Sequence, residues 1–273
     1  MADSLDDAVA KKFGNRNTEF SLNDKSHIKN IIGVVSGKGG VGKSTVTLLL
    51  ALELNKMGYK VGILDADITG PSIPKAFGLG NGVDGNEDGT LIVPPLTKSG
   101  IKIMSINLFL EDPEKPVLWR GPMIASALKQ LYSDVLWEEL DYLLIDMPPG
   151  TGDVSMTVFQ SIVPDGVVIV STPQDLVKMI VGKAVNMAND MKVKVLGLIE
   201  NMSFMVCPTC QEILFPFGPS HLDSVAQHFE IEALQSLPID PRINELVDLG
   251  LAEGIDSEYV KEACEKIIDN LKK

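Results

Sequence analysis

The chain has 273 residues, of which 45% are hydrophobic and 22% are charged, and its formal net charge is −13. This composition is typical of a globular protein, and the length suits one large α/β domain or two small ones. The acidic balance argues against nonspecific binding to nucleic acid or to an anionic membrane, since both need clustered positive charge. The sequence shows no signal-peptide pattern and no apolar run of membrane-spanning length, and its three cysteines do not form a disulfide framework. We therefore expect a cytoplasmic protein with no nucleic-acid or membrane partner.

Short apolar runs alternate with helical patterns along most of the chain. Residues 1–29 are polar and weakly patterned, which predicts a flexible N-terminal tail, and the Gly/Asp/Asn-rich segment 78–90 predicts a loop. Buried strands are predicted at 30–36, 59–65, 101–107, 141–147, 166–172 and 193–201, and helices at 43–58, 175–191 and 257–273. Continuous apolar strands that alternate with helices predict an α/β fold. We expect one domain, residues 30–273, with a mostly parallel sheet covered by helices on both faces.

The segment GKGGVGKST, residues 37–45, directly follows the first predicted strand and opens the first predicted helix. Gly37, Gly42, Lys43 and Ser44 satisfy the G-x-x-x-x-G-K-[ST] pattern in the strand–loop–helix context that gives it meaning. The glycines let backbone N–H groups surround phosphate oxygens, and the helix N-terminus adds the positive end of its dipole. We expect Lys43 to contact the β- and γ-phosphates and Ser44 to bind Mg²⁺. The predicted nucleotide contacts of this loop are Gly37, Lys38, Gly39, Gly40, Val41, Gly42, Lys43, Ser44 and Thr45.

Lys38 is a second lysine in this loop, directly after the first glycine. A solvated loop lysine is one interpretation. The pattern K-G-G-x-G-K-[ST] also resembles the deviant Walker A motif of the MinD/ParA/nitrogenase-iron-protein class of P-loop ATPases. That resemblance implies that Lys38 crosses a dimer interface and acts on the partner's nucleotide, as an arginine finger does.

Two of the predicted strands end in aspartates. Asp65 ends the strand at 59–65 and Asp67 follows it, and Asp146 lies at the end of the strand at 141–147. The carboxyl ends of parallel strands meet at the ligand crevice of an α/β sheet. We expect Asp67 to orient the attacking water, Asp146 to hold Mg²⁺ through water and Asp65 to support the Mg²⁺ shell. A helix cap is the alternative role for any one of these aspartates.

Several segments together resemble the Mrp/ApbC-type iron–sulfur cluster carrier ATPases. They are SGKGGVGKST (36–45), VLWRGPM (117–123), DYLLIDMPPGTGD (141–153) and ENMSFMVCPTC (200–210), and the resemblance runs from about residue 30 to about residue 250. It implies a homodimeric ATPase, slow without partners, that uses ATP and Mg²⁺, receives a [4Fe–4S] cluster from an assembly scaffold and transfers it to apoproteins. It also implies that Asn201 binds adenine and that Pro238 and Asp240 line the base site. Trp119 and Arg120 belong to the matching segments without an assigned role.

The pair Cys207 and Cys210, in a segment of about residues 201–218, has the spacing of metal ligands, but a tetrahedral thiolate site needs four sulfurs. Within one chain the other soft ligands are Cys264 and three histidines, among them His221. The simplest complete site therefore takes one C-x-x-C pair from each of two copies related by a two-fold axis. Four thiolates suit a [4Fe–4S] cluster or zinc, and the resemblance favours the cluster. The alternative functions are a MinD/ParA-like positioning ATPase and a zinc-stapled dimeric ATPase, and the alternative role of the cysteines is a redox pair.

Overall fold

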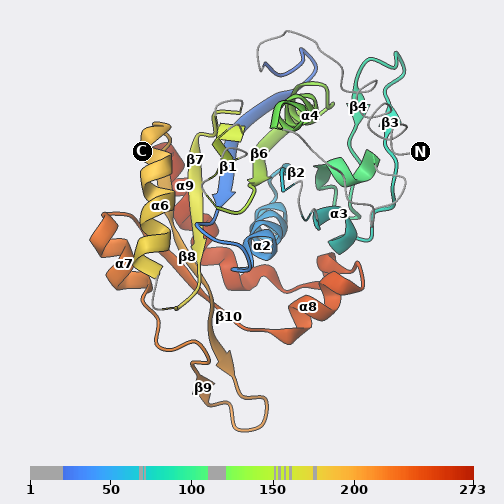
Figure 1. Ribbon diagram of the computed structural model, residues 1–273. Helices are drawn as coiled ribbons and strands as arrows, with labels where there is room; N and C mark the ends of the chain where they lie inside the picture. Colours follow the sequence, from blue (N-terminus) through green and yellow to red (C-terminus); the bar gives the residue numbers. More distant parts are fainter. Residues whose placement is uncertain are drawn as a thin grey trace, which may run out of the picture.

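The computed structural model describes residues 21–67, 70, 72–109, 121–150, 152, 155–156, 158–159, 162–174 and 177–273 (Figure 1). Its centre is a parallel sheet with the strand order β10-β8-β7-β1-β6-β2-β5, and β9 pairs antiparallel with β8. The strands are β1 (His27–Val35), β2 (Val61–Asp65), β5 (Lys102–Ser105), β6 (Glu139–Asp146), β7 (Gly166–Ser171), β8 (Val195–Val206), β9 (Ile213–Leu214) and β10 (Ala233–Pro238). A separate two-stranded hairpin is formed by β3 (Asp84–Gly85) and β4 (Ile92–Val93).

Helices cover both faces of the sheet, which is why β2 and β7 and the second halves of β1 and β6 are buried residue after residue. On one face, α4 (Gly121–Ser133), α6 (Val177–Asp190) and α7 (Leu222–Phe229) enclose a core that contains Trp137 and Phe159. On the other face lie α2 (Lys43–Lys56), α3 (Ile73–Ala76), α8 (Pro241–Asp248) and α9 (Lys261–Lys272), with the short 3-10 helices η2 (Ala252–Gly254) and η3 (Ser257–Val260). A further 3-10 helix, η1 (Ile106–Phe109), follows β5. Among the described residues, no helix is both long enough and apolar enough to span a bilayer.

The strand register brings the ends of the central strands together at one edge of the sheet. Asp65, the last residue of β2, pairs with Asp146, the last residue of β6, and Val34 of β1 pairs with the same Asp146. The loop after β1 leads into α2 at this edge. The fold therefore places the predicted phosphate loop beside both predicted carboxylate segments.

The predicted α/β class, the parallel sheet and the six strands are confirmed, and the predicted C-terminal helix packs on the core through Val260, Cys264, Ile267 and Ile268. The predicted tail is wrong for its described end. The β1 strand begins at His27, and Asn23 donates hydrogen bonds of 2.8 Å to the carbonyl oxygens of Ser133 and Val135. The strand β10 is not among the predicted strands, and the predicted loop at 78–90 contributes the short strand β3.

Candidate functional site

The loop between β1 and α2 has the backbone of a phosphate-binding nest. Gly40 and Gly42 both have a φ of 78°, in the left-handed region that favours glycine. A Cβ atom on Gly42 would lie 2.2 Å from Nδ2 of Asn201, and one on Gly37 would lie 2.3 Å from the carbonyl oxygen of Ile180. The loop surrounds a cavity of about 200 Å³ that Ser44 and Thr45 also line. Shape and backbone therefore fit the phosphates of a nucleotide.

Asp146 gathers the polar side chains at the start of α2. Its carboxylate lies 2.5 Å from Nζ of Lys43, accepts a hydrogen bond of 2.6 Å from the hydroxyl of Ser44 and accepts one of 3.0 Å from the hydroxyl of Thr47. The side chains of Lys43 and Asp146 are 5% and 1% exposed. A carboxylate and a hydroxyl side by side are the oxygen donors that Mg²⁺ prefers. Ser44 and Asp146 thus fit the predicted metal position.

The two aspartates at the end of β2, Asp65 as its last residue and Asp67 just beyond it, differ in their surroundings. Asp67 lies 3.9 Å from Nζ of Lys43 and lines the phosphate cavity. Asp65 is fully buried, and it accepts hydrogen bonds from the Ser105 hydroxyl at 3.2 Å and from the backbone N–H of Ile73 at 3.4 Å. Burial, with the charge of Asp146 next, raises the pKa of Asp65 well above its usual range. The structure therefore brings Asp67 to the phosphate loop and holds Asp65 behind it.

Lys38 lies on the outer side of the phosphate loop. Its ammonium group contacts the side-chain oxygen of Gln174, an exposed residue that follows β7. The half-buried Lys38 is therefore near the surface and close to its own loop. Its predicted action across a dimer interface stays a prediction.

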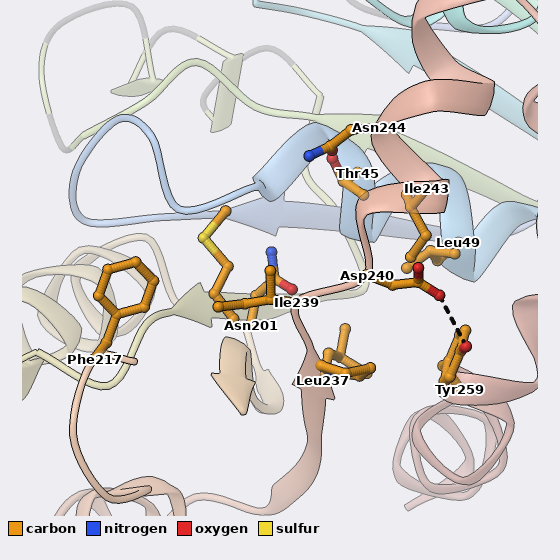
Figure 2. Close-up of a pocket in the computed structure, with 12 residues that line it drawn as sticks. Thr45, Leu49, Asn201, Phe217, Leu237, Ile239, Asp240, Ile243, Asn244 and Tyr259 are labelled. Atoms are coloured by element: carbon orange, nitrogen blue, oxygen red, sulfur yellow. Dashed lines mark hydrogen bonds between the residues drawn. The ribbon is translucent and has the colours of Figure 1, made fainter. Parts of the chain in front are cut away.

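A second cavity, of about 220 Å³, adjoins Thr45 of the phosphate loop (Figure 2). Asn201, Pro238 and Asp240 all line it, so the structure brings the three predicted base-site residues together. Asn201 directs its amide to the phosphate loop, donating a hydrogen bond of 3.0 Å to the carbonyl of Val41. The other lining residues are Leu49, Met202, Phe217, Leu237, Ile239, Ile243, Asn244 and Tyr259.

Asp240 is engaged by two neighbours at one end of this base cavity. Its carboxylate pairs with Arg242 at 2.7 Å and accepts a hydrogen bond of 3.1 Å from the Tyr259 hydroxyl. The hydrogen bond from Arg242 lowers the pKa of Asp240 despite partial burial. Asp240 also accepts from the backbone N–H of Arg242 and so caps α8. Asp240 therefore orders this wall of the cavity, a role its sequence position did not predict.

Cys207 and Cys210 lie in the turn between β8 and β9, on a hairpin that projects from the sheet (Figure 1). We call residues 206–214 the cysteine hairpin. The N–H of Cys207 donates to the carbonyl of Glu212 and the N–H of Gln211 donates to the carbonyl of Cys207, each at 2.9 Å. Hydrogen bonds from the backbone of Cys210 and then of Thr209 lower the pKa of the Cys207 thiol. The turn therefore favours the thiolate, the form that binds metals.

The described part of the chain offers the two thiols no further ligand. It contains no group of three or more His, Cys, Asp or Glu side chains that could hold a metal ion. Cys264 is buried in the core against α2, and burial raises the pKa of its thiol. His221 precedes α7 and uses its backbone N–H on the buried Glu200. Trp119 and Arg120 lie outside the described residues.

Three polar residues near the site escaped the sequence analysis. Thr47 follows Lys43 by one helical turn, a spacing that could have indicated its contact with Asp146. Glu200 is buried beside Asn201 and accepts hydrogen bonds from the Ser203 hydroxyl at 2.7 Å and from the His221 N–H at 2.9 Å. Gln174, the contact of Lys38, has no sequence signal that we can identify.

Known proteins are similar to this chain in sequence over most of its length. An iron-sulfur cluster carrier protein from Clostridium perfringens is 48% identical over 242 residues, which are 86% of this chain and 84% of that protein. One from Methanocaldococcus jannaschii is 45% identical over 251 residues, covering 90% of this chain and 86% of the relative.

Solved structures give the same result for the fold. A nucleotide-binding protein from Archaeoglobus fulgidus, in complex with ADP, is 46% identical, covers 85% of this chain and 92% of its own, and superposes with a TM-score of 0.76. The cell division ATPase MinD from Pyrococcus furiosus is 21% identical with a TM-score of 0.60, covers 88% of this chain and 99% of its own, and shares the fold alone. The family model of the NUBPL iron-transfer P-loop NTPases matches residues 27–272. The chain therefore belongs to the NUBPL iron-transfer P-loop NTPases.

Proposed function

We propose that this protein is a Mg²⁺-dependent ATPase and an iron–sulfur cluster carrier. Two copies bind one cluster at their shared interface and transfer it to apoproteins. The observation that carries the proposal is the cysteine hairpin, which presents two thiols at its tip and is a direct continuation of β8 beyond the base cavity. A nucleotide site and a thiol pair are thus built on one strand. The relatives named iron-sulfur cluster carrier proteins support the same assignment.

In this proposal each nucleotide-site residue has its own task. The loop from Gly37 to Thr45 and the side chain of Lys43 hold the phosphates, while Ser44 and Asp146 hold Mg²⁺, which neutralises phosphate charge when bound. Asp67, next to Lys43, orients the attacking water. Asp65 supports the Mg²⁺ shell from behind, and Lys38 acts on the nucleotide of a second copy.

The cluster is the cargo, and its [4Fe–4S] form needs four thiolates. One chain offers two on its hairpin, so a second copy completes the set in a two-fold arrangement. Exposed apolar side chains flank the thiols, with Val206 41%, Ile213 54% and Leu214 38% exposed. A second copy would bury them, which favours a homodimer at this hairpin.

Anaerobic reconstitution with iron and sulfide tests the proposal on the wild type and on the Cys207→Ala/Cys210→Ala variant. The expected result is a brown dimer with about four irons per two chains, and the variant should not form it. Size-exclusion chromatography measures the dimer, and absorbance measures the cluster. Cys264→Ala is the matched control, because this buried thiol should leave cluster binding intact. A colourless wild type that retains zinc would instead favour a zinc-stapled dimer and would refute the carrier function.

A further inference from the structure

Phe217 lies on the chain that returns from the cysteine hairpin, yet it lines the base cavity. Figure 2 shows its ring at one end of the cavity, with Tyr259 at the other end and Asn201 between them. The side chain is 43% exposed, and neither hydrophobic core cluster of the described residues includes it. Core packing therefore does not account for the position of this ring.

A tight turn holds the backbone at Phe217. The N–H of Gly218 donates a hydrogen bond of 3.1 Å to the carbonyl of Phe215, with Pro216 and Phe217 at the two central positions. Proline is favoured at the first central position of such a turn because its ring fixes φ. Gly218 follows with a φ of 90°, which favours glycine. Local sequence thus defines the backbone from which the Phe217 ring projects.

The far end of the returning chain is anchored beside the same cavity. His221 donates its backbone N–H to the buried carboxylate of Glu200, the neighbour of Asn201 on β8. The chain leaves the cavity at Asn201, forms the cysteine hairpin and comes back to the cavity at Phe217. The segment from Asn201 to Phe217, which contains both thiols, therefore lines the base cavity at each of its ends.

We propose that Phe217 is a nucleotide-binding residue whose ring packs against the purine base and couples base binding to the position of the cysteine hairpin. This inference rests on the nucleotide binding in the proposed function, and it does not need the cluster. Aromatic rings bind bases through their π faces, and an apolar ring at the cavity wall offers such a face. Because coupling between two sites is reciprocal, a base held by Phe217 also restrains the hairpin.

Calorimetric titration with ADP tests the contact on the full-length protein. Phe217→Ala should weaken ADP binding by about 5- to 140-fold, the range expected for loss of one base–aromatic contact, and Phe217→Tyr should retain wild-type affinity. Phe215→Ala is the matched control, because Phe215 is a similarly exposed ring (52%) of the same turn that does not line the cavity. Circular dichroism and thermal unfolding verify that each variant is folded. Equal ADP affinity in Phe217→Ala and wild type would overturn the inference.

Thiol labelling tests the coupling. With the iron-free protein and iodoacetamide, saturating ADP should slow the labelling of Cys207 and Cys210 in wild type and in Phe215→Ala, but not in Phe217→Ala. The buried Cys264 should stay unlabelled and so reports that the protein is folded. An ADP effect of the same size in Phe217→Ala, or none in wild type, would overturn the coupling.

The outcomes separate this inference from the proposed function. A wild type that binds ADP but no iron would refute the carrier function. The ADP affinity of Phe217→Ala would then still decide whether Phe217 binds the base. A wild type that binds iron and ADP, with Phe217→Ala unchanged, would refute the inference alone. A wild type without ADP binding would refute both.

Discussion

Replacing Asp146 by asparagine should destabilise the nucleotide-free protein. The substitution keeps the shape of the side chain but removes the negative charge that lies 2.5 Å from the buried Nζ of Lys43. Breaking a buried ion pair in this way typically costs about 3–5 kcal/mol. Two features of the site reduce the loss. Asp67 remains 3.9 Å from Lys43, and the repulsion that Asp146 exerts on Asp65 disappears.

We therefore expect the free energy of unfolding to fall by about 3 kcal/mol, the lower end of that range. For a chain of this size the fall corresponds to a decrease in Tm of about 5 °C. Thermal unfolding followed by circular dichroism measures it, and Asp269→Asn is the control. Asp269 also forms an ion pair, with Lys272, but both side chains are 70% exposed, so its loss should leave Tm unchanged.

A double-variant cycle isolates the pair itself. Lys43→Met removes the cation and leaves Asp146 with the hydroxyl donors Ser44 and Thr47. Combined with Asp146→Asn, it should be more stable than the sum of the two single changes by about 2 kcal/mol, because no buried lysine remains unpaired. Additive effects, or an Asp146→Asn variant as stable as wild type, would refute the reasoning.

Three further changes have distinct expected outcomes. Gly42→Ala should abolish ADP binding measured by calorimetry, because the new Cβ atom would meet Nδ2 of Asn201 at 2.2 Å in a left-handed backbone; retained affinity would contradict this. Burial raises the pKa of Asp65, so the folded state favours its protonated form and stability is lost as pH rises above the ordinary value of 3.8. Asp65→Asn should therefore gain stability relative to wild type as the pH rises above about 4 in urea unfolding, and a pH-independent difference would argue against it. Ser257→Ala removes a 2.6 Å hydrogen bond to the buried Glu53 and should lower the free energy of unfolding by about 1–3 kcal/mol in the same assay, whereas an unchanged midpoint would show that Glu53 finds another donor.

The inner strands could be predicted from sequence because their environment leaves one kind of side chain possible. The strand β7 and the second half of β6 are buried on both faces, so their segments are nearly continuous apolar runs. The strand β10 forms an edge of the sheet, and its half-buried Gln235 and Ser236 interrupt the apolar pattern. Polar residues also explain why residues 21–29 were predicted to be a flexible tail. Asn23 and Ser26 are polar, but their side chains hydrogen-bond to backbone groups of a distant segment. Polar side chains that bond across the chain carry no local signal.

The phosphate loop was predictable because its functional groups belong to consecutive residues. The link between the base cavity and the cysteine hairpin depends instead on where the chain runs after the hairpin, which the sequence does not show. Asn201 and the C-x-x-C pair are close in sequence, and their proximity predicts only that one segment serves both. The position of Phe217 follows from the turn that begins at Phe215 and from the buried contact of Glu200 with His221. Together they close a loop whose two ends lie at the base cavity. A hairpin fixed at both ends to one ligand site cannot shift without changing that site, and for this reason we expect the thiols to respond to the nucleotide base as well as to its phosphates.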